Sequence, residues 1–297
     1  MYEAINSNIR KTYFYIFLVF CLLIGVGWFF SWYLGDSTIL IWAVFFALFY
    51  NLIAYFYSDQ IVLTINRARE ITKKDAPDFF RLVENLSIRS GLPMPHLYII
   101  DDPSPNAFAT GRDPKNASIA VTSGLLETMD KAELNAVLAH EMSHIKNYDI
   151  RLQTVIAVLA GAIVILINFL SRIWIFGDRD NRQNNLIALI GFLIIIILAP
   201  ILGQLIQLAI SRRRELLADA TSVDFTRYPQ GLVGALEKIN NFKKPMQNTD
   251  YATAHLFFAS PMHSDATDKE NVGFMAQLFM THPPISERIK ALEKMHF

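Results

Sequence analysis

Four long apolar runs divide this chain into alternating apolar and polar parts. A helix rises about 1.5 Å per residue, so about 20 apolar residues suffice to cross the hydrocarbon core of a bilayer. A short polar turn separates the first run from the second, and another separates the third from the fourth. The pattern predicts four transmembrane helices in two hairpins, over residues of roughly 13–35, 38–58, 152–175 and 185–210.

The polar sequence falls into two parts that alternate with these hairpins. We expect an N-terminal hairpin over 1–60, a polar part over 61–151, a second hairpin over 152–210 and a polar part over 211–297. The first run is longer than the apolar core of a signal peptide and lacks a small-residue cleavage site, so we expect it to be retained. Since each hairpin returns the chain to the side it left, both polar parts should meet at one membrane face.

Basic residues gather on one side of the predicted membrane helices. Arg10 and Lys11 precede the first run, Lys146 and Arg151 precede the third, and Arg212–Arg214 follow the fourth. The turns on the opposite side carry fewer basic residues, and aspartates accompany them. The positive-inside bias therefore predicts a multi-pass protein of the cell (plasma) membrane whose N-terminus and polar parts lie in the cytoplasm.

The polar part between the hairpins has the pattern of a small α+β domain. Apolar positions recur at helical spacing over 78–90, and Gly91 then ends the predicted helix. Asp130 is a suitable cap for a second helix that continues to Asn147. Short, partly β-branched runs separated by turn residues predict a small sheet. These runs cover 97–100, 107–110 and 118–122.

The second of these predicted helices carries the motif His140-Glu-Met-Ser-His144. Residues four apart lie on one helix face, so both imidazoles can bind a single Zn²⁺. Glu141 lies between them, where a carboxylate can take a proton from the attacking water. So short a motif occurs by chance in roughly one chain in a hundred, so its context must support it.

Glu215 is the candidate for a third ligand, which a site with two histidines requires. It follows the fourth apolar run, and Asp219 lies one helical turn further along. That spacing would let Glu215 bind the metal while Asp219 reaches the second nitrogen of a histidine. Taken alone, the two acids also fit an ordinary interfacial helix in which they pair with Arg212–Arg214. Together with the histidines, they predict one Zn²⁺ per chain.

The composition agrees with a membrane protein and excludes several other classes. Hydrophobic residues make up 53% of the 297 positions, which is above the usual share of a soluble domain. Basic and acidic residues number 27 each, so the net charge does not indicate nucleic-acid binding. The single cysteine, Cys21, excludes an intrachain disulfide framework and a cysteine-ligated zinc site. Histidines and carboxylates must therefore supply any metal site.

The two motifs together resemble the membrane-bound zinc metalloprotease family of HtpX and the CAAX-prenyl endopeptidases, with HtpX the closer match. The similarity extends over nearly the whole chain and includes Asn106-Ala-Phe-Ala-Thr-Gly111 and Thr281-His-Pro-Pro-Ile-Ser-Glu-Arg288. It implies a gluzincin-like metalloprotease domain on a multi-pass helical membrane protein. It also implies a cytoplasm-facing endopeptidase in quality control, acting on unfolded or misfolded membrane proteins beside the lipid bilayer.

The resemblance also suggests roles for residues outside the metal site. The family's edge strand, which pairs with an extended substrate, would correspond to Asn106, Ala107, Phe108 and Ala109, although a plain turn into a strand fits the same residues. His282 precedes two prolines that stiffen its backbone. It could donate a hydrogen bond to the oxyanion of the tetrahedral intermediate, or it could belong to a simple capping loop. Arg288 is expected to tie nearby acids structurally.

Three alternatives remain open from the sequence. An intramembrane protease would carry its histidines in a spanning helix, but Lys131, Glu133 and Lys146 flank the motif and favour a water-exposed segment. A non-enzymatic scaffold with a structural zinc is disfavoured, because three protein ligands leave one coordination position open. A prenyl-peptide processing enzyme would share the chemistry, and the compact chain with four predicted spans favours the HtpX-like branch over it.

Overall fold

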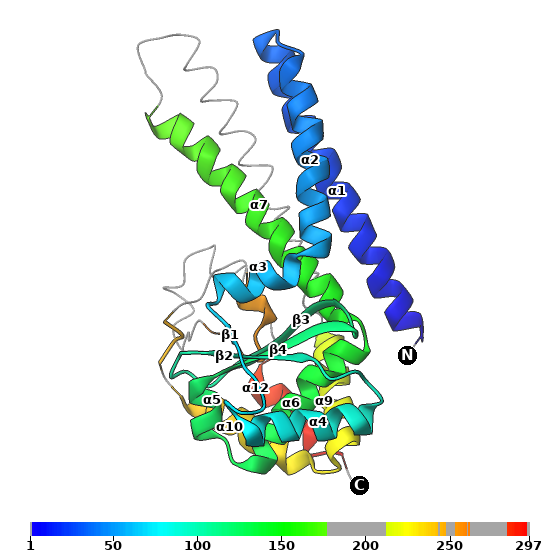
Figure 1. Cartoon of the computed structure of the whole chain (residues 1–297), viewed down its shortest axis with the longest axis vertical. Helices are drawn as coiled ribbons and strands as arrows, with labels where there is room; N and C mark the ends of the chain where they lie inside the picture. The colour runs from blue at the N-terminus through cyan, green and yellow to red at the C-terminus, as the bar shows by residue number, and fades with distance from the viewer. Residues whose placement is uncertain are drawn as a thin grey trace.

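The computed structural model describes residues 2–176, 212–242, 244–247, 253–259, 261 and 284–295. Three long apolar helices extend away from a domain that is built around a small sheet (Figure 1). This mixture of helices and a sheet confirms the α+β class. In Figure 1 helices α4, α6, α9, α10 and α12 lie on the side of the sheet that faces away from the apolar helices.

The apolar helices are α1 (Tyr2–Leu34), α2 (Thr38–Phe56) and α7 (Asp149–Phe176). Within them, three stretches are long and apolar enough to cross a membrane: Asn6–Leu34, Thr38–Phe56 and Asp149–Asn168. Three of the four predicted spans thus have a helix. The fourth predicted span, 185–210, lies outside the described residues, and so does the second hairpin that it would complete.

The first hairpin presents aromatic side chains outward, as expected for helices in lipid. Trp32, Trp42 and Phe46 are each more than half exposed. A sharp turn joins the two helices at Gly35, whose φ of 69° is readily adopted only by glycine. The α7 helix is much more buried, because its first turns pack against the sheet and the short helix α3 (Ser58–Ile65).

The sheet has four strands in the order β1-β2-β4-β3. Their bounds are Arg69–Glu70 for β1, His96–Ile100 for β2, Ala107–Asp113 for β3 and Asn116–Thr122 for β4. β2 and β4 are parallel, whereas β3 and β4 form an antiparallel hairpin. Strand β3 is therefore an edge strand of the sheet. All three predicted strands are present, and the two-residue strand β1 is an addition to them.

Side chains alternate between the two faces of the sheet. On one face, Phe108 and Ala120 pack against α3 and Phe257. On the other face, Ala109 and Ile119 belong to the main core, which the remaining helices build. These are α4 (Pro77–Ser90), α5 (Ser123–Thr128), α6 (Lys131–Lys146), α9 (Arg212–Thr226), α10 (Pro229–Asn241) and α12 (Ile285–Leu292). A short 3-10 helix, η1 (Ala254–Leu256), lies near β3 and α7.

Helix α6 is the centre of the domain, and its ends are where the sequence predicts them. Asp130 accepts hydrogen bonds from the N–H groups of Ala132 and Glu133, and the Glu133 side chain accepts one from Asp130 in return, which forms a capping box. Twelve of its 16 residues are buried, among them the whole segment from Leu134 to Ile145 apart from Asn135. α6 is not among the candidate membrane spans of the described residues.

Candidate metal centre

Two imidazoles from successive turns of α6 face each other in the interior of the domain. The Nε2 atoms of His140 and His144 are 3.1 Å apart, and the ring centroids are 4.7 Å apart. Both side chains are buried. Their spacing of four residues places them on one face of the helix, as the motif requires.

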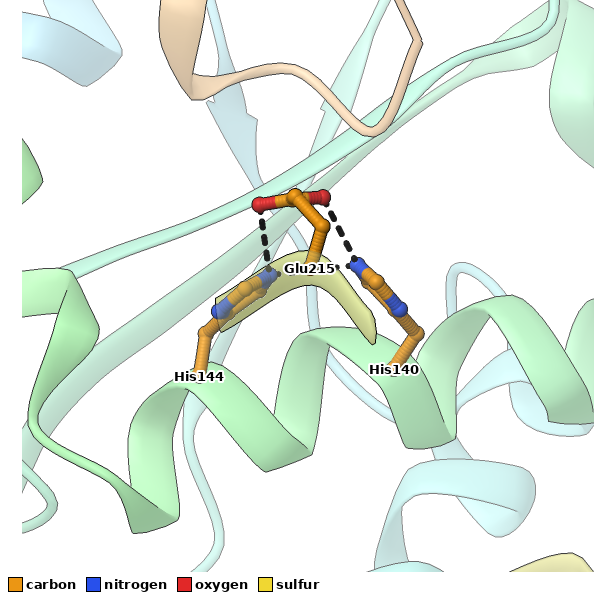
Figure 2. A group of neighbouring side chains, drawn as sticks. All are labelled: His140, His144 and Glu215. Atoms are coloured by element: carbon orange, nitrogen blue, oxygen red, sulfur yellow. Dashed lines mark hydrogen bonds and ion pairs between the residues drawn. The ribbon is translucent and has the colours of Figure 1, made fainter. Parts of the chain in front are cut away.

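Glu215 reaches the same point from helix α9, which packs along α6. One of its carboxylate oxygens lies 3.7 Å from Nε2 of His140, and the other lies 3.7 Å from Nε2 of His144. Figure 2 shows the carboxylate above the two rings, with both nitrogens directed toward it. A hydrogen bond from the Ser222 hydroxyl to the Ala136 carbonyl also joins the two helices and fixes their register.

The second nitrogen of His140 faces Asp219, one turn after Glu215. Its Nδ1 is 2.9 Å from a carboxylate oxygen of Asp219. Arg288 donates two hydrogen bonds to the same carboxylate, of 2.9 and 2.6 Å. Burial favours a raised pKa for Asp219, but the Arg288 guanidinium and the His140 hydrogen bond lower it to about 2. Asp219 is thus a buried carboxylate that stays charged.

Asp149 has the corresponding position beside His144, which the sequence did not indicate. An oxygen of Asp149 lies 3.0 Å from Nδ1 of His144. The chain reverses between α6 and α7 at Tyr148, whose φ is 58°, and this left-handed residue turns Asp149 back toward the histidine. Both imidazoles therefore have Nδ1 held by a carboxylate. In a neutral ring this arrangement makes Nε2 the nitrogen whose lone pair can bind a metal.

The pKa of His144 reflects its acidic surroundings. Burial favours a lower pKa, but the hydrogen bond to Asp149 and the nearby charges, first that of Glu215, raise it to about 9. These carboxylates stabilise a positive charge at the point where the two Nε2 atoms meet. The same surroundings suit a metal cation.

Glu141 is almost fully buried next to the two histidines. Burial raises the pKa of the Glu141 carboxyl, and the negative charge of Glu215 raises it further. The positive charges of His140 and His144 lower it, but the net shift is upward. The backbone N–H of Ala109 on strand β3 donates a hydrogen bond to it. Glu141 is thereby held between α6 and the edge strand.

The segment from Asn106 to Ala109 lies beside this site and is buried. The N–H of Phe258 donates to the carbonyl of Ala107 at 2.7 Å, in the manner of a neighbouring strand. The side chain of Asn106 donates to the Ala259 carbonyl at 2.9 Å and accepts from the Ala259 N–H at 3.2 Å. A piece of the chain's own backbone thus lies along the outer edge of β3.

Of the remaining sequence candidates, His282 lies outside the described residues. Arg288 is buried and ties Asp219 to the carbonyl of Phe258, as expected of a structural tie. Its guanidinium stacks on the Phe258 ring, with 4.5 Å between Cζ and the ring centroid. The Phe258 ring also meets the imidazole of His140 edge-on, with 4.9 Å between the two ring centroids.

The donor set fits a zinc ion. Ligand atoms of His140, His144 and Glu215 all lie within 4.8 Å of one another, and no other group of this kind occurs among the residues that the structure describes. Two imidazole nitrogens and one carboxylate are a donor set that zinc takes in hydrolytic sites, at about 2.0–2.2 Å from each ligand atom. The Nδ1 atoms of both histidines are paired with carboxylates, as is usual for metal-bound histidines.

Comparisons with known proteins agree with this arrangement. The model of the peptidase family M48 matches residues 73–296. A protease HtpX homolog of Dictyoglomus turgidum is 47% identical over 296 residues, which cover 99% of this chain and 94% of that protein. A protease HtpX homolog of Tropheryma whipplei is 43% identical over 295 residues, covering 99% and 98%.

A solved structure shares the fold. The crystal structure of S. mikatae Ste24p matches with a TM-score of 0.50 and 18% identity, over 99% of this chain and 67% of that one. The family model matches about three quarters of the chain, and each of the two relatives is similar to it over 99% of its length. The chain therefore belongs to peptidase family M48 and is a membrane-bound metalloendopeptidase.

Proposed function

We propose that this metalloendopeptidase uses one zinc ion to hydrolyse peptide bonds of misfolded or damaged membrane proteins, in protein quality control. The observation that carries the zinc site is the convergence of two Nε2 atoms and one carboxylate, with both Nδ1 atoms held by further carboxylates. The naming of the relatives as HtpX homologs supports the quality-control role.

Each residue of the site has a distinct part in this proposal. His140, His144 and Glu215 would hold the ion, and Asp219 would orient His140. A bound zinc ion would supply Lewis acidity toward water and toward the scissile carbonyl. Glu141 takes a proton from the attacking water and passes it to the leaving amine. Its burial beside the ligands keeps bulk water away from that proton transfer.

The substrate would bind as an extended strand along the outer edge of β3. Backbone groups of Asn106, Ala107, Phe108 and Ala109 would pair with it and would read little of its side chains, which suits a broad specificity. Phe258 and Ala259 now contact Ala107 and Asn106. A substrate that pairs at these positions must therefore displace that segment. His282 would donate a hydrogen bond to the oxyanion.

We further propose that the catalytic domain and the N-terminus lie in the cytoplasm of a multi-pass protein in the cell membrane. The apolar helices α1, α2 and α7 support membrane insertion. The basic clusters that begin with Arg10 and Lys11 support the orientation. Membership of a peptidase family decides against the non-enzymatic scaffold. The absence of α6 from the candidate spans of the described residues supports a histidine pair outside the membrane.

Cleavage of an unfolded model protein by the detergent-purified full chain tests the proposal. Wild type should cleave it, a chelator should abolish cleavage, and Glu141→Gln should bind zinc yet lose nearly all turnover. Glu127→Gln, at an exposed carboxylate on α5, is the matched control and should cleave as wild type does. Undiminished cleavage by zinc-loaded Glu141→Gln would exclude Glu141 as the base. Cleavage restricted to prenylated peptides would favour the processing enzyme instead.

A further inference from the structure

The first helix of the membrane hairpin reaches the metal centre. Helix α1 has 33 residues and is about 50 Å long, whereas the hydrocarbon core of a bilayer is about 30 Å thick. Its first turns are polar and contain Asn6, Asn8, Arg10 and Lys11. In Figure 1 this end of α1 lies beside the domain, below the level at which α2 ends.

Asn8 makes the contact between this helix end and the site. Its Nδ2 donates to a carboxylate oxygen of Asp149 at 2.7 Å and to the carbonyl of Asn147 at 3.3 Å. Asn8 is 5% exposed and Asp149 is 1% exposed. A hydrogen bond to a charged acceptor in such a buried place is strong, because water does not compete for it.

The two oxygens of Asp149 serve different partners. Oδ2 faces Nδ1 of His144, and Oδ1 accepts from Asn8. Arg214, next to Glu215 on α9, lies further away, at 3.8 Å from Oδ1. Asn8 thus fixes the rotation of the carboxylate, and the carboxylate fixes the orientation and tautomer of the imidazole. Without Asn8, the carboxylate is free to turn toward Arg214 and away from His144.

We infer that Asn8 is a positioning residue for the metal site, acting on His144 through Asp149. The inference rests on the proposed zinc site. It makes the N-terminal membrane helix a part of the catalytic apparatus as well as an anchor. Loss of a residue that hydrogen-bonds directly to a metal-bound histidine typically lowers metal affinity 10- to 100-fold. For Asn8, which acts one residue further out, we expect roughly a 10-fold loss of zinc affinity.

The test is the zinc dissociation constant of the full chain in detergent, measured by competition with a chromogenic chelator. Asn8→Ala should raise it roughly 10-fold. Asn8→Gln retains an amide donor and should recover part of the loss. Thr12→Val is the matched control, because Thr12 is also buried on α1 but its hydroxyl bonds only to the carbonyl of Asn8 in its own helix. This control should bind zinc as wild type does.

A double-mutant cycle separates positioning from a general loss of packing. On an Asp149→Ala background, Asn8→Ala should change zinc affinity no further, because the carboxylate through which Asn8 is inferred to act on His144 has been removed. A purely structural role for Asn8 would instead lower affinity by the same factor on both backgrounds. The absorption spectrum of the Co²⁺-substituted protein should change in Asn8→Ala and stay unchanged in Thr12→Val.

The outcomes also separate this inference from the proposed function. Wild-type zinc affinity in Asn8→Ala would overturn the role of Asn8 and leave the zinc protease standing. Additive effects in the cycle would overturn it as well. If wild type itself bound no zinc, the proposed function and the role of Asn8 would fail together.

Discussion

Arg288 donates two hydrogen bonds to the carboxylate of Asp219, and Asp219 in turn contacts Nδ1 of His140. Arg288 is 1% exposed and Asp219 is fully buried. A charge in such a place requires a partner, because its desolvation costs several kcal/mol. Residues from α6, α9 and α12 are thereby linked into one buried network that ends at a candidate metal ligand.

Replacement of Arg288 by methionine should therefore destabilise the protein strongly. It leaves the Asp219 carboxylate buried without its cation, which typically costs about 3–5 kcal/mol. Thermal unfolding of the purified chain in detergent measures this loss. Lys290→Met, two residues away on the exposed face of α12, is the control and should unfold at the wild-type temperature. The same unfolding temperature in both variants would contradict the buried pair.

Asp149→Asn should weaken zinc binding without unfolding the domain. The amide preserves the size of the side chain but removes the charge that holds the Nδ1–H of His144, so the imidazole becomes a poorer ligand. Partners of this kind contribute 10- to 100-fold to metal affinity. Asp224→Asn, at an exposed carboxylate that pairs with Arg227, supplies the comparison. A dissociation constant unchanged from that of the control would exclude an orienting role for Asp149.

Removal of zinc should lower the unfolding temperature. A ligand that binds only the folded state stabilises it by about 2.7 kcal/mol when its free concentration is 100 times the dissociation constant. Unfolding scans with added zinc and with a chelator give the difference. In Glu215→Ala, which lacks a proposed ligand, the two scans should coincide or nearly so. An equally large shift in that variant would place the zinc elsewhere.

Gly111→Ala should destabilise the edge strand next to the site. Gly111 has a φ of 140°, and an added Cβ would lie 2.3 Å from the carbonyl oxygen of Asn116. Strained backbone of this kind costs about 1–3 kcal/mol. Gly161→Ala in α7 meets no atom within 4 Å and should be neutral or slightly stabilising. Equal unfolding temperatures for the two variants would contradict the close approach at Gly111.

Much of the domain was predictable because its local signals are strong. The capping box at Asp130 and the left-handed Gly91 place the ends of α6 and α4 within a residue or two of the prediction. The pattern did not show β1, because two residues cannot display an alternation. It also missed the break at Tyr57, where the chain leaves α2 and begins α3 within an apolar stretch.

In the candidate metal site, too, some residues were predicted from the sequence and others were not. His140 and His144 have the four-residue spacing that a zinc site on a helix requires, and Glu215 was a candidate because it follows the fourth apolar run with Asp219 one turn further along. From the sequence, Asp149 fits a cap between the metal helix and the third span, and its contact with His144 was not predicted because it depends on the left-handed conformation of Tyr148, which the residue type does not signal. The contact of Asn8 with Asp149 spans 141 positions, and only the packing of α1 against the domain brings it about.

The link from Arg288 to His140 joins residues 148 positions apart, and this sets an order of events during synthesis. Ribosomes add about 5–20 residues per second, so His140 exists for roughly 7 to 30 s before Arg288 is made. For the last 69 positions of that interval Asp219 is present without its cation, and throughout it the histidine motif lacks the complete network that orients it. The network that orients His140 can therefore be completed only after nearly all of the chain has been synthesised.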